Sequence, residues 1–169
     1  MAVVSNTSPL TNLLAIDRFQ LLFEIYDSVT IPEAVVEEIT VDKDKPNPKQ
    51  GQIPKEELGS LSWLEIRQVD NHDLVRSLTR ELDPGESEAI ALAVETEAEL
   101  LLIDERRGRD VARQMGVNPT GLLGVLIEAR AREIITKVKP ILDSLRVDAG
   151  FWISEELYQR VIREVEEGS

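Results

Sequence analysis

The chain has 169 residues, of which 42% are apolar and 30% are charged, and its formal net charge is −13. This length and balance exclude a disordered chain and favour one globular domain with a full hydrophobic core. The absence of cysteine excludes disulfides, thiolate zinc sites and cysteine nucleophiles, and the acidic charge excludes binding of nucleic acid through the whole surface.

The N-terminus and the hydropathy of the chain predict an intracellular protein. Residues 1–6 lack the basic region and the long apolar run of a secretory signal. No stretch approaches the roughly 18 consecutive apolar residues that a membrane span requires. Together with the missing cysteines, these features lead us to expect a cytoplasmic location without membrane contact.

Strand and helix signals alternate through the first half of the chain. Residues 2–4 form a short apolar run typical of a buried strand, and Thr7, Ser8 and Pro9 predict a helix start. The alternation continues with a helix at 19–26, a strand at 28–31, a helix from Pro32 and an edge strand at 63–69. Lysines and prolines at 41–57 predict a surface loop within the domain.

The second half of the chain is mainly helical, with one strand. An apolar run at 100–103 is typical of a central parallel strand, and Asp104 ends it. Helices are predicted after Gly85, at 105–115, at 120–132, at 138–145 and in a C-terminal helical extension at 150–169. The alternation predicts a single α/β domain spanning 1–169, with a central parallel sheet covered by helices on both faces.

Acidic and amide side chains occur where such a sheet would bind a ligand. Ligands of open parallel sheets bind beyond the carboxyl ends of the strands, and Asn6 and Asp104 follow two predicted strands. Glu38 lies near the end of a predicted helix, where the helix dipole disfavours negative charge and a cation would compensate. Glu86 and Glu88 open another predicted helix.

Each of these residues also has a structural interpretation. Glu86 and Glu88 would stabilise a helix start, and Asp104 would cap the helix that follows it. Asn6 tolerates turn geometry, and Glu38 or its neighbour Glu37 would be an exposed helix glutamate. The residues alone leave both interpretations open.

Segments taken in chain order resemble PIN domains related to VapC toxins. They are VVSNTSPL at 3–10, IPEAVVEEI at 31–39, DPGESEAIALA at 83–93, LIDERRGR at 102–109 and TGLLGVL at 120–126. The resemblance covers nearly the whole chain except the loop of lysines and prolines. It implies a PIN-like three-layer fold with a metal-dependent nuclease site.

The resemblance places ligands of Mg²⁺ or Mn²⁺ at Asn6, Glu38, Glu88 and Asp104, with Glu86 as a further candidate. Oxygen ligands suit such hard cations, and the metal activates water and neutralises charge on the scissile phosphate. Glu38, Glu88 and Asp104 would be catalytic. The implied function is an endoribonuclease that hydrolyses RNA, as the toxin of a toxin–antitoxin-like pair with a small antitoxin protein and a homodimeric state.

The first position departs from the family, which usually has aspartate where this chain has Asn6. An amide oxygen still ligates a hard cation, but it brings no charge, so metal affinity is expected to fall. The alternative function is therefore a catalytically weakened or inactive PIN-like module that acts by binding RNA or protein.

Arginines follow Asp104 on one predicted helical face and are candidates for RNA contacts: Arg106, Arg109 and Arg113. Ordinary pairs with Glu105 and Asp110 are the alternative. Thr120 is expected to cap a helix or to line the site. The two tryptophans, Trp63 and Trp152, are expected to anchor the core or an interface rather than to stack on bases.

Overall fold

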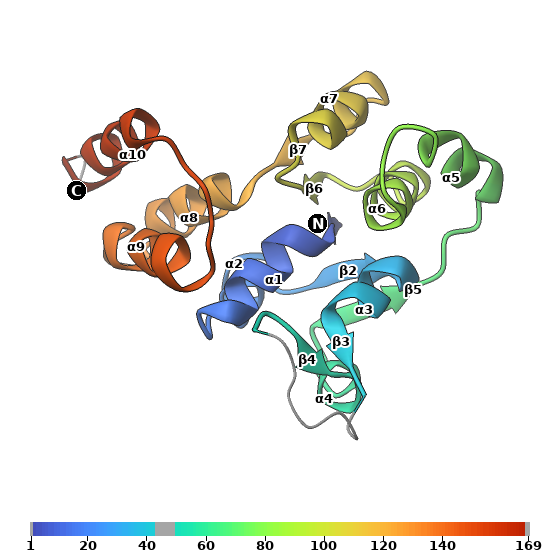
Figure 1. The fold of residues 1–169 in the computed structure, drawn as a ribbon, viewed down its shortest axis with the longest axis horizontal. Coiled ribbons are helices and arrows are strands. Elements are labelled where there is room, and N and C mark those ends of the chain that lie inside the picture. The colour runs from blue at the N-terminus through green and yellow to red at the C-terminus, as the bar shows by residue number, and fades with distance from the viewer. Residues whose placement is uncertain (1, 43–49, 168–169) are drawn as a thin grey trace.

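The computed structural model describes residues 2–42 and 50–167, and Figure 1 shows its ribbon. Five parallel strands form the central sheet in the order β5-β2-β1-β6-β7. These strands are β1 (Val3–Ser5), β2 (Val29–Pro32), β5 (Leu64–Arg67), β6 (Leu100–Leu102) and β7 (Pro119–Thr120). The four predicted strands are present as β1, β2, β5 and β6, and the predicted edge strand, β5, lies at one edge of the sheet. β7 was not predicted, since Thr120 was expected to begin a helix.

Ten helices in the described residues surround this sheet. In chain order they are α1 (Thr7–Ala15), α2 (Leu21–Tyr26), α3 (Glu33–Ile39), α4 (Lys55–Gly59), α5 (His72–Leu78), α6 (Pro84–Glu95), α7 (Arg106–Gln114), α8 (Leu122–Ala131), α9 (Lys139–Asp148) and α10 (Glu155–Glu167). None of them combines the length and apolar character needed to span a membrane.

Side chains alternate between the two faces of the sheet, as strand geometry requires. Val3 and Leu102 belong to a core cluster with residues of α1, α2, α3, α8, α9 and α10. Val4, Leu101 and Ile103 belong to a second cluster with residues of α5, α6 and α7. Helices therefore cover both faces of a parallel sheet, and the predicted α/β three-layer fold is confirmed (Figure 1).

The segment expected as a surface loop contains regular structure. β3 (Thr40–Val41) pairs with β4 (Ile53–Pro54) in a separate two-stranded sheet, and α4 follows directly. Two apolar side chains explain this difference, because Ile53 and Leu58 are buried in the core. Residues 43–49, which carry three of the lysines, lie outside the described part of the chain.

The C-terminal extension packs on its own domain. Tyr158 and Val161 of α10 are buried, and Leu157, Ile162 and Val165 pack against the same core cluster. The amphipathic face predicted from the sequence is therefore used within the chain.

Candidate metal centre

Two strand ends meet in the middle of the sheet at its carboxyl edge. Ser5 at the end of β1 is paired with Leu102 at the end of β6. Asn6 follows β1, and its backbone N–H donates to the Leu102 carbonyl at 2.8 Å. The connection after β1 leads to β2 on one side, whereas β6 and β7 lie on the other. Parallel α/β sheets bind ligands where the strand order reverses in this way.

Asn6 is buried with an unsatisfied side chain. It is 3% exposed, and within the described residues its Oδ1 has no hydrogen-bond partner. It occupies the N-cap position of α1, but its side chain accepts no bond from that helix. Leaving such an oxygen unpaired costs about 1–3 kcal/mol, so a turn role alone does not account for it. A bound cation would satisfy it.

Asp104 follows β6, the strand that pairs with β1, and one of its two oxygens has no hydrogen-bond partner in the described residues. Its Oδ1 accepts a hydrogen bond from the Leu122 N–H, in the first turn of α8, at 2.7 Å. Its Oδ2 is buried without a partner in the described chain. Burial and the charge of Glu105 raise the pKa of Asp104, although the Leu122 amide, the Arg109 guanidinium and the Ser8 hydroxyl act in the opposite direction. The capping interpretation is thus correct in kind, but the helix contacted is α8 rather than α7.

Glu38 reaches the site from the last turns of α3. Its Oε2 accepts a hydrogen bond from the Thr7 hydroxyl at 2.6 Å, which ties α3 to the first turn of α1. A Cβ atom added at Gly85 would lie 2.7 Å from Glu38 Oε1, so the start of α6 also lies against this carboxylate. Glu38 therefore lies between the starts of α1 and α6.

Glu86 and Glu88 have different surroundings, because two residues apart on a helix means roughly 200° around its axis. Glu86 is 7% exposed. Burial, then a hydrogen bond and the charge of Asp83, and the charges of Glu105 and Glu38, raise its pKa to about 8. The Glu88 carboxylate instead accepts a hydrogen bond from the Ala34 N–H, at the start of α3, at 3.1 Å.

The structure therefore brings Glu86, the further candidate, into the electrostatic environment of Glu38. It places Glu88 on a backbone amide at the other end of α3 from Glu38. The role of Glu88 as a metal ligand stays a prediction, and the contacts favour Glu86 for that role.

Glycines line the acidic cluster where helices approach it. A Cβ atom added at Gly108 would lie 2.7 Å from Glu86 Oε2, and one added at Gly121 would lie 2.8 Å from Asp104 Oδ1. Real Cβ atoms essentially never come that close to another heavy atom. Together with Gly85, these residues allow three helix starts to lie directly against three carboxylates.

The acidic residues do not form a finished coordination sphere. No group of three His, Cys, Asp or Glu side chains among the described residues is arranged to hold a metal ion. Like charges repel, and the carboxylates are held by protein groups: Glu38 by Thr7, Asp104 by Leu122 and Glu86 by Asp83. The donor set itself, carboxylate oxygens with one amide oxygen, is the set that hard cations prefer.

The residues present therefore fit Mg²⁺ or Mn²⁺ in donor chemistry and in unsatisfied capacity. The unpaired oxygens of Asn6 and Asp104 provide two positions on neighbouring strand ends. The flexible side chains of Glu38 and Glu86 would have to rotate to complete the site.

The candidate RNA contacts fall into two groups. Arg109 lies close enough to Asp104 to act on its pKa, whereas Arg113 pairs with Asp110 at 3.3 Å on the surface. Arg106 is exposed in the first turn of α7. Thr120 lies in β7 and lines a cavity with Asp104. It caps no helix, since the N-cap of α8 is Gly121.

Sequence reasoning missed two residues at the site. Thr7 was expected to begin a helix, but its hydroxyl also fixes Glu38. Glu105 was considered only as an ion-pair partner, but its charge contributes to the raised pKa of Glu86. Their positions next to Asn6 and Asp104 in the chain were the available signal.

Comparison with known families bears on the fold and the family of the chain. A family model described as a PIN domain matches residues 2–167. A comparison with curated proteins found no significant match. PIN domains are generally nucleases and typically use divalent metals. Because the match covers nearly the whole chain and the parallel sheet is that of the fold, this chain belongs to the PIN-domain family.

Proposed function

We propose that this chain is a Mg²⁺- or Mn²⁺-dependent endoribonuclease whose metal ligands are Asn6, Glu38, Glu86 and Asp104. The observation that carries the proposal is the pair of unpaired buried oxygens, Asn6 Oδ1 and Asp104 Oδ2, at the carboxyl edge of the sheet. Buried oxygens without partners are costly. Raised pKa values in such a cluster are typical of functional sites.

The proposed metal ligands would have different roles. When bound, a divalent ion lowers the pKa of a coordinated water and neutralises charge on the scissile phosphate. Asp104 is oriented by the Leu122 amide, which leaves Oδ2 for a ligand. Glu38 is positioned by Thr7. Glu86, with its pKa of about 8, holds a proton near neutral pH that a cation would displace.

Glu88 has a different part in this proposal. Its carboxylate fixes the start of α3 through Ala34, and α3 carries Glu38. Glu88→Gln should therefore leave Mn²⁺ affinity within about threefold of wild type, whereas Glu86→Gln should lower it about tenfold or more, because a lost charge beside a divalent ion exceeds about 1.4 kcal/mol. Calorimetric titration of both variants makes the test, and the reverse order of effects would restore Glu88 as a ligand.

The proposed context is a cytoplasmic toxin–antitoxin-like pair. PIN nucleases bind RNA and often pair with antitoxins. A small antitoxin would block the site, and a basic side chain is the natural group to enter an acidic cluster. The same family context suggests a homodimer. Light scattering at micromolar concentration should give twice the mass of the chain, and a strict monomer would remove the dimer from the proposal.

The neutral amide of Asn6 supports a second candidate, a PIN-like module with weak or no catalysis. Asn6→Asp separates the two functions. In a nuclease weakened by one missing charge, this substitution should tighten Mn²⁺ binding about tenfold or more and raise RNA cleavage. It should also lower stability without metal, because it adds a fourth carboxylate, and Mn²⁺ should restore that stability.

The experiment is a melting series with and without Mn²⁺, beside one RNA cleavage assay, for wild type, Asn6→Asp and Asp104→Asn. Destabilisation by Asn6→Asp without rescue by Mn²⁺, together with no cleavage by any form, would favour the inactive module. Wild-type cleavage equal to that of Asn6→Asp would show that the amide suffices as a ligand.

A further inference from the structure

A cavity of about 830 Å³ extends from the candidate metal centre to the segment before α10. Its polar lining includes Asn12, Arg109 and the carboxylates of Asp104 and Glu105. Its apolar lining includes Ile127, Trp152 and Leu157. The volume is within the range of small-molecule sites, about 300–1,000 Å³. One continuous hollow thus joins an acidic site and an arginine to an aromatic ring.

Trp152 is unusually exposed for its size. Its exposed fraction is 82%, whereas Trp63 is 7% exposed and packs against Phe19 in the core. Of the two tryptophans expected as core or interface anchors, Trp63 therefore has the core role and Trp152 does not. An indole ring left in water at a cavity is suited to contact a ligand.

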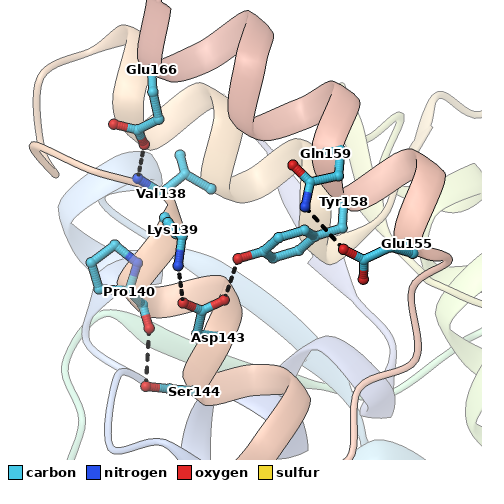
Figure 2. Close-up of polar contacts among 9 residues, drawn as sticks. All are labelled: Val138, Lys139, Pro140, Asp143, Ser144, Glu155, Tyr158, Gln159 and Glu166. Carbon is cyan, nitrogen blue, oxygen red and sulfur yellow. Dashed lines mark hydrogen bonds and ion pairs between the residues drawn. The ribbon is translucent and has the colours of Figure 1, made fainter.

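The backbone that carries Trp152 is held from both sides. Phe151 donates its backbone N–H to the Leu145 carbonyl at 2.9 Å, and the neighbouring Ile153 is buried. α9 and α10, which flank this segment, are fastened to each other by the contacts in Figure 2. There Asp143 accepts hydrogen bonds from both Lys139 and Tyr158. Trp152 is thus presented on an ordered segment.

The charge of the protein limits what could occupy the cavity with affinity. At a net charge of −13 the protein repels a polyanion at long range. Arg109 is the one basic side chain that lines this cavity in the described chain. Stacking of a base on an aromatic ring needs no net charge and contributes about 1–3 kcal/mol per base. An RNA ligand would therefore depend on stacking more than on phosphate contacts.

We propose that this cavity is a subsite for one unpaired RNA nucleotide, whose base stacks on Trp152 while a flanking phosphate faces Arg109. The inference rests on the proposed ribonuclease function and assigns the contacts of one substrate nucleotide to Trp152 and Arg109. Bases in a double helix are stacked on their neighbours and are not available to a protein ring, whereas unpaired bases are. The subsite thus selects single strands beside the metal centre.

The test is binding of a short, labelled single-stranded oligoribonucleotide in EDTA, measured by fluorescence anisotropy. Cleavage cannot occur under these conditions, so binding is measured apart from catalysis. Trp152→Ala should weaken binding about five- to 150-fold, the range expected for loss of one stacked base. Trp152→Phe should retain most of the affinity. Duplex RNA of the same sequence should bind more weakly and should not respond to either substitution.

Val147→Ala is the matched control, because Val147 on α9 is also 82% exposed and does not line the cavity. Its RNA affinity should equal that of wild type. Intrinsic fluorescence gives a second readout: single-stranded RNA should quench the exposed Trp152, and the emission of buried Trp63 should remain.

Three outcomes would overturn the subsite. The first is an RNA affinity of Trp152→Ala equal to that of wild type. The second is a loss of RNA affinity in Val147→Ala as large as that in Trp152→Ala. The third is a change in molar mass on substitution of Trp152 without a change in RNA affinity, which would assign the ring to a protein contact. Failure of the ribonuclease proposal is distinguishable. A wild type that binds single strands through Trp152 but cleaves nothing with Mn²⁺ would retain the subsite and lose the enzyme.

Discussion

The pKa values of carboxyl groups are shifted in opposite directions in two regions of this protein. On α9, Asp143 accepts hydrogen bonds from Lys139 and Tyr158, and these partners, Lys139 foremost, lower its pKa. At the carboxyl edge of the sheet, burial raises the pKa values of Glu86 and Asp104. In the first region the hydrogen bonds from Lys139 and Tyr158 outweigh burial, whereas in the second burial outweighs the Arg109 guanidinium that acts on Asp104.

This difference separates a structural contact from a candidate site. Asp143, Lys139 and Tyr158 satisfy one another and join α9 to α10 (Figure 2). Glu86 lies near other acidic side chains, and one oxygen of Asp104 has no partner in the described residues. Perturbed pKa values of this kind are typical of functional sites.

The largest effect is expected from Asp104→Asn on catalysis. Asparagine retains an oxygen for the Leu122 amide but loses the charge. Metal stabilisation of the transition state is worth several kcal/mol, so RNA cleavage in Mn²⁺ should fall about a thousandfold. Asp143→Asn is the isosteric control and should cleave like wild type. Undiminished cleavage by the Asp104 variant would mean that the metal centre lies elsewhere.

Glu86→Gln should change the pH dependence of stability without metal. In the folded state Glu86 keeps its proton up to about pH 8, whereas in the unfolded chain it ionises near pH 4.5. Between these values the unfolded state binds fewer protons, so the free energy of unfolding falls as pH rises. Wild type should lose on the order of 2–4 kcal/mol relative to Glu86→Gln between pH 5.5 and 8.5.

Urea denaturation in EDTA at the two pH values measures this difference. Glu88→Gln is the neighbouring control and should parallel wild type. Parallel pH profiles for wild type and Glu86→Gln would show that Glu86 is ionised in the folded protein throughout, and that it carries no proton for a cation to displace.

Gly108→Ala should disturb the approach of α7 to the acidic cluster. The added Cβ would lie 2.6 Å from Ile103 Cδ1 and 2.7 Å from Glu86 Oε2. Overpacking of this kind costs about 1–3 kcal/mol, partly offset by the better helix propensity of alanine. Gly59→Ala is the control, because an added Cβ there meets nothing within 4 Å. Equal unfolding free energies for the two variants would contradict the close approach.

The smallest effect is expected from Asp143→Asn on stability. Its side chain is 40% exposed and that of Lys139 is 55% exposed, and exposed pairs are worth about 0–1 kcal/mol. The free energy of unfolding should fall by no more than that, and the response to Mn²⁺ should not change. A loss of several kcal/mol would show that the α9–α10 contact contributes more to stability than an exposed pair does, and would contradict this account.

Much of the fold could be predicted because its signals are local. The strands at 2–4 and 100–103 could be predicted because each is an apolar run. The carboxyl ends of parallel strands lie at the same edge of a sheet, so Asn6 and Asp104 could be placed at one edge. The resemblance to PIN domains supplied the three-layer arrangement. The loop predicted at 41–57 is too long, because it includes β4 and the start of α4. Ile53 and Leu58 are isolated apolar residues in the sequence, and only their burial in the fold shows that they hold these elements in place.

The site was harder to predict because it depends on which way side chains turn. Glu86 and Glu88 differ by roughly 200° around one helix, and both lie at its start. The packing of α3 and α7 against α6 decides which of them meets Glu38. The exposure of Trp152 could not be predicted either, because tryptophan is usually largely buried. Only the fold shows that this ring is exposed and lines the cavity.

The central claim is that the acidic edge of the sheet binds a divalent cation in the folded state. The most direct measurement is the melting temperature of wild type and Asp104→Asn against increasing Mn²⁺, with NaCl of matched ionic strength. At a hundred times the dissociation constant, specific binding stabilises the fold by about 2.7 kcal/mol, which raises the melting temperature by about 5–10 °C for a domain of this size. We predict this rise for wild type in Mn²⁺, and little change for wild type in NaCl or for Asp104→Asn in Mn²⁺. Equal shifts of wild type in the two salts, or of both proteins in Mn²⁺, would contradict it.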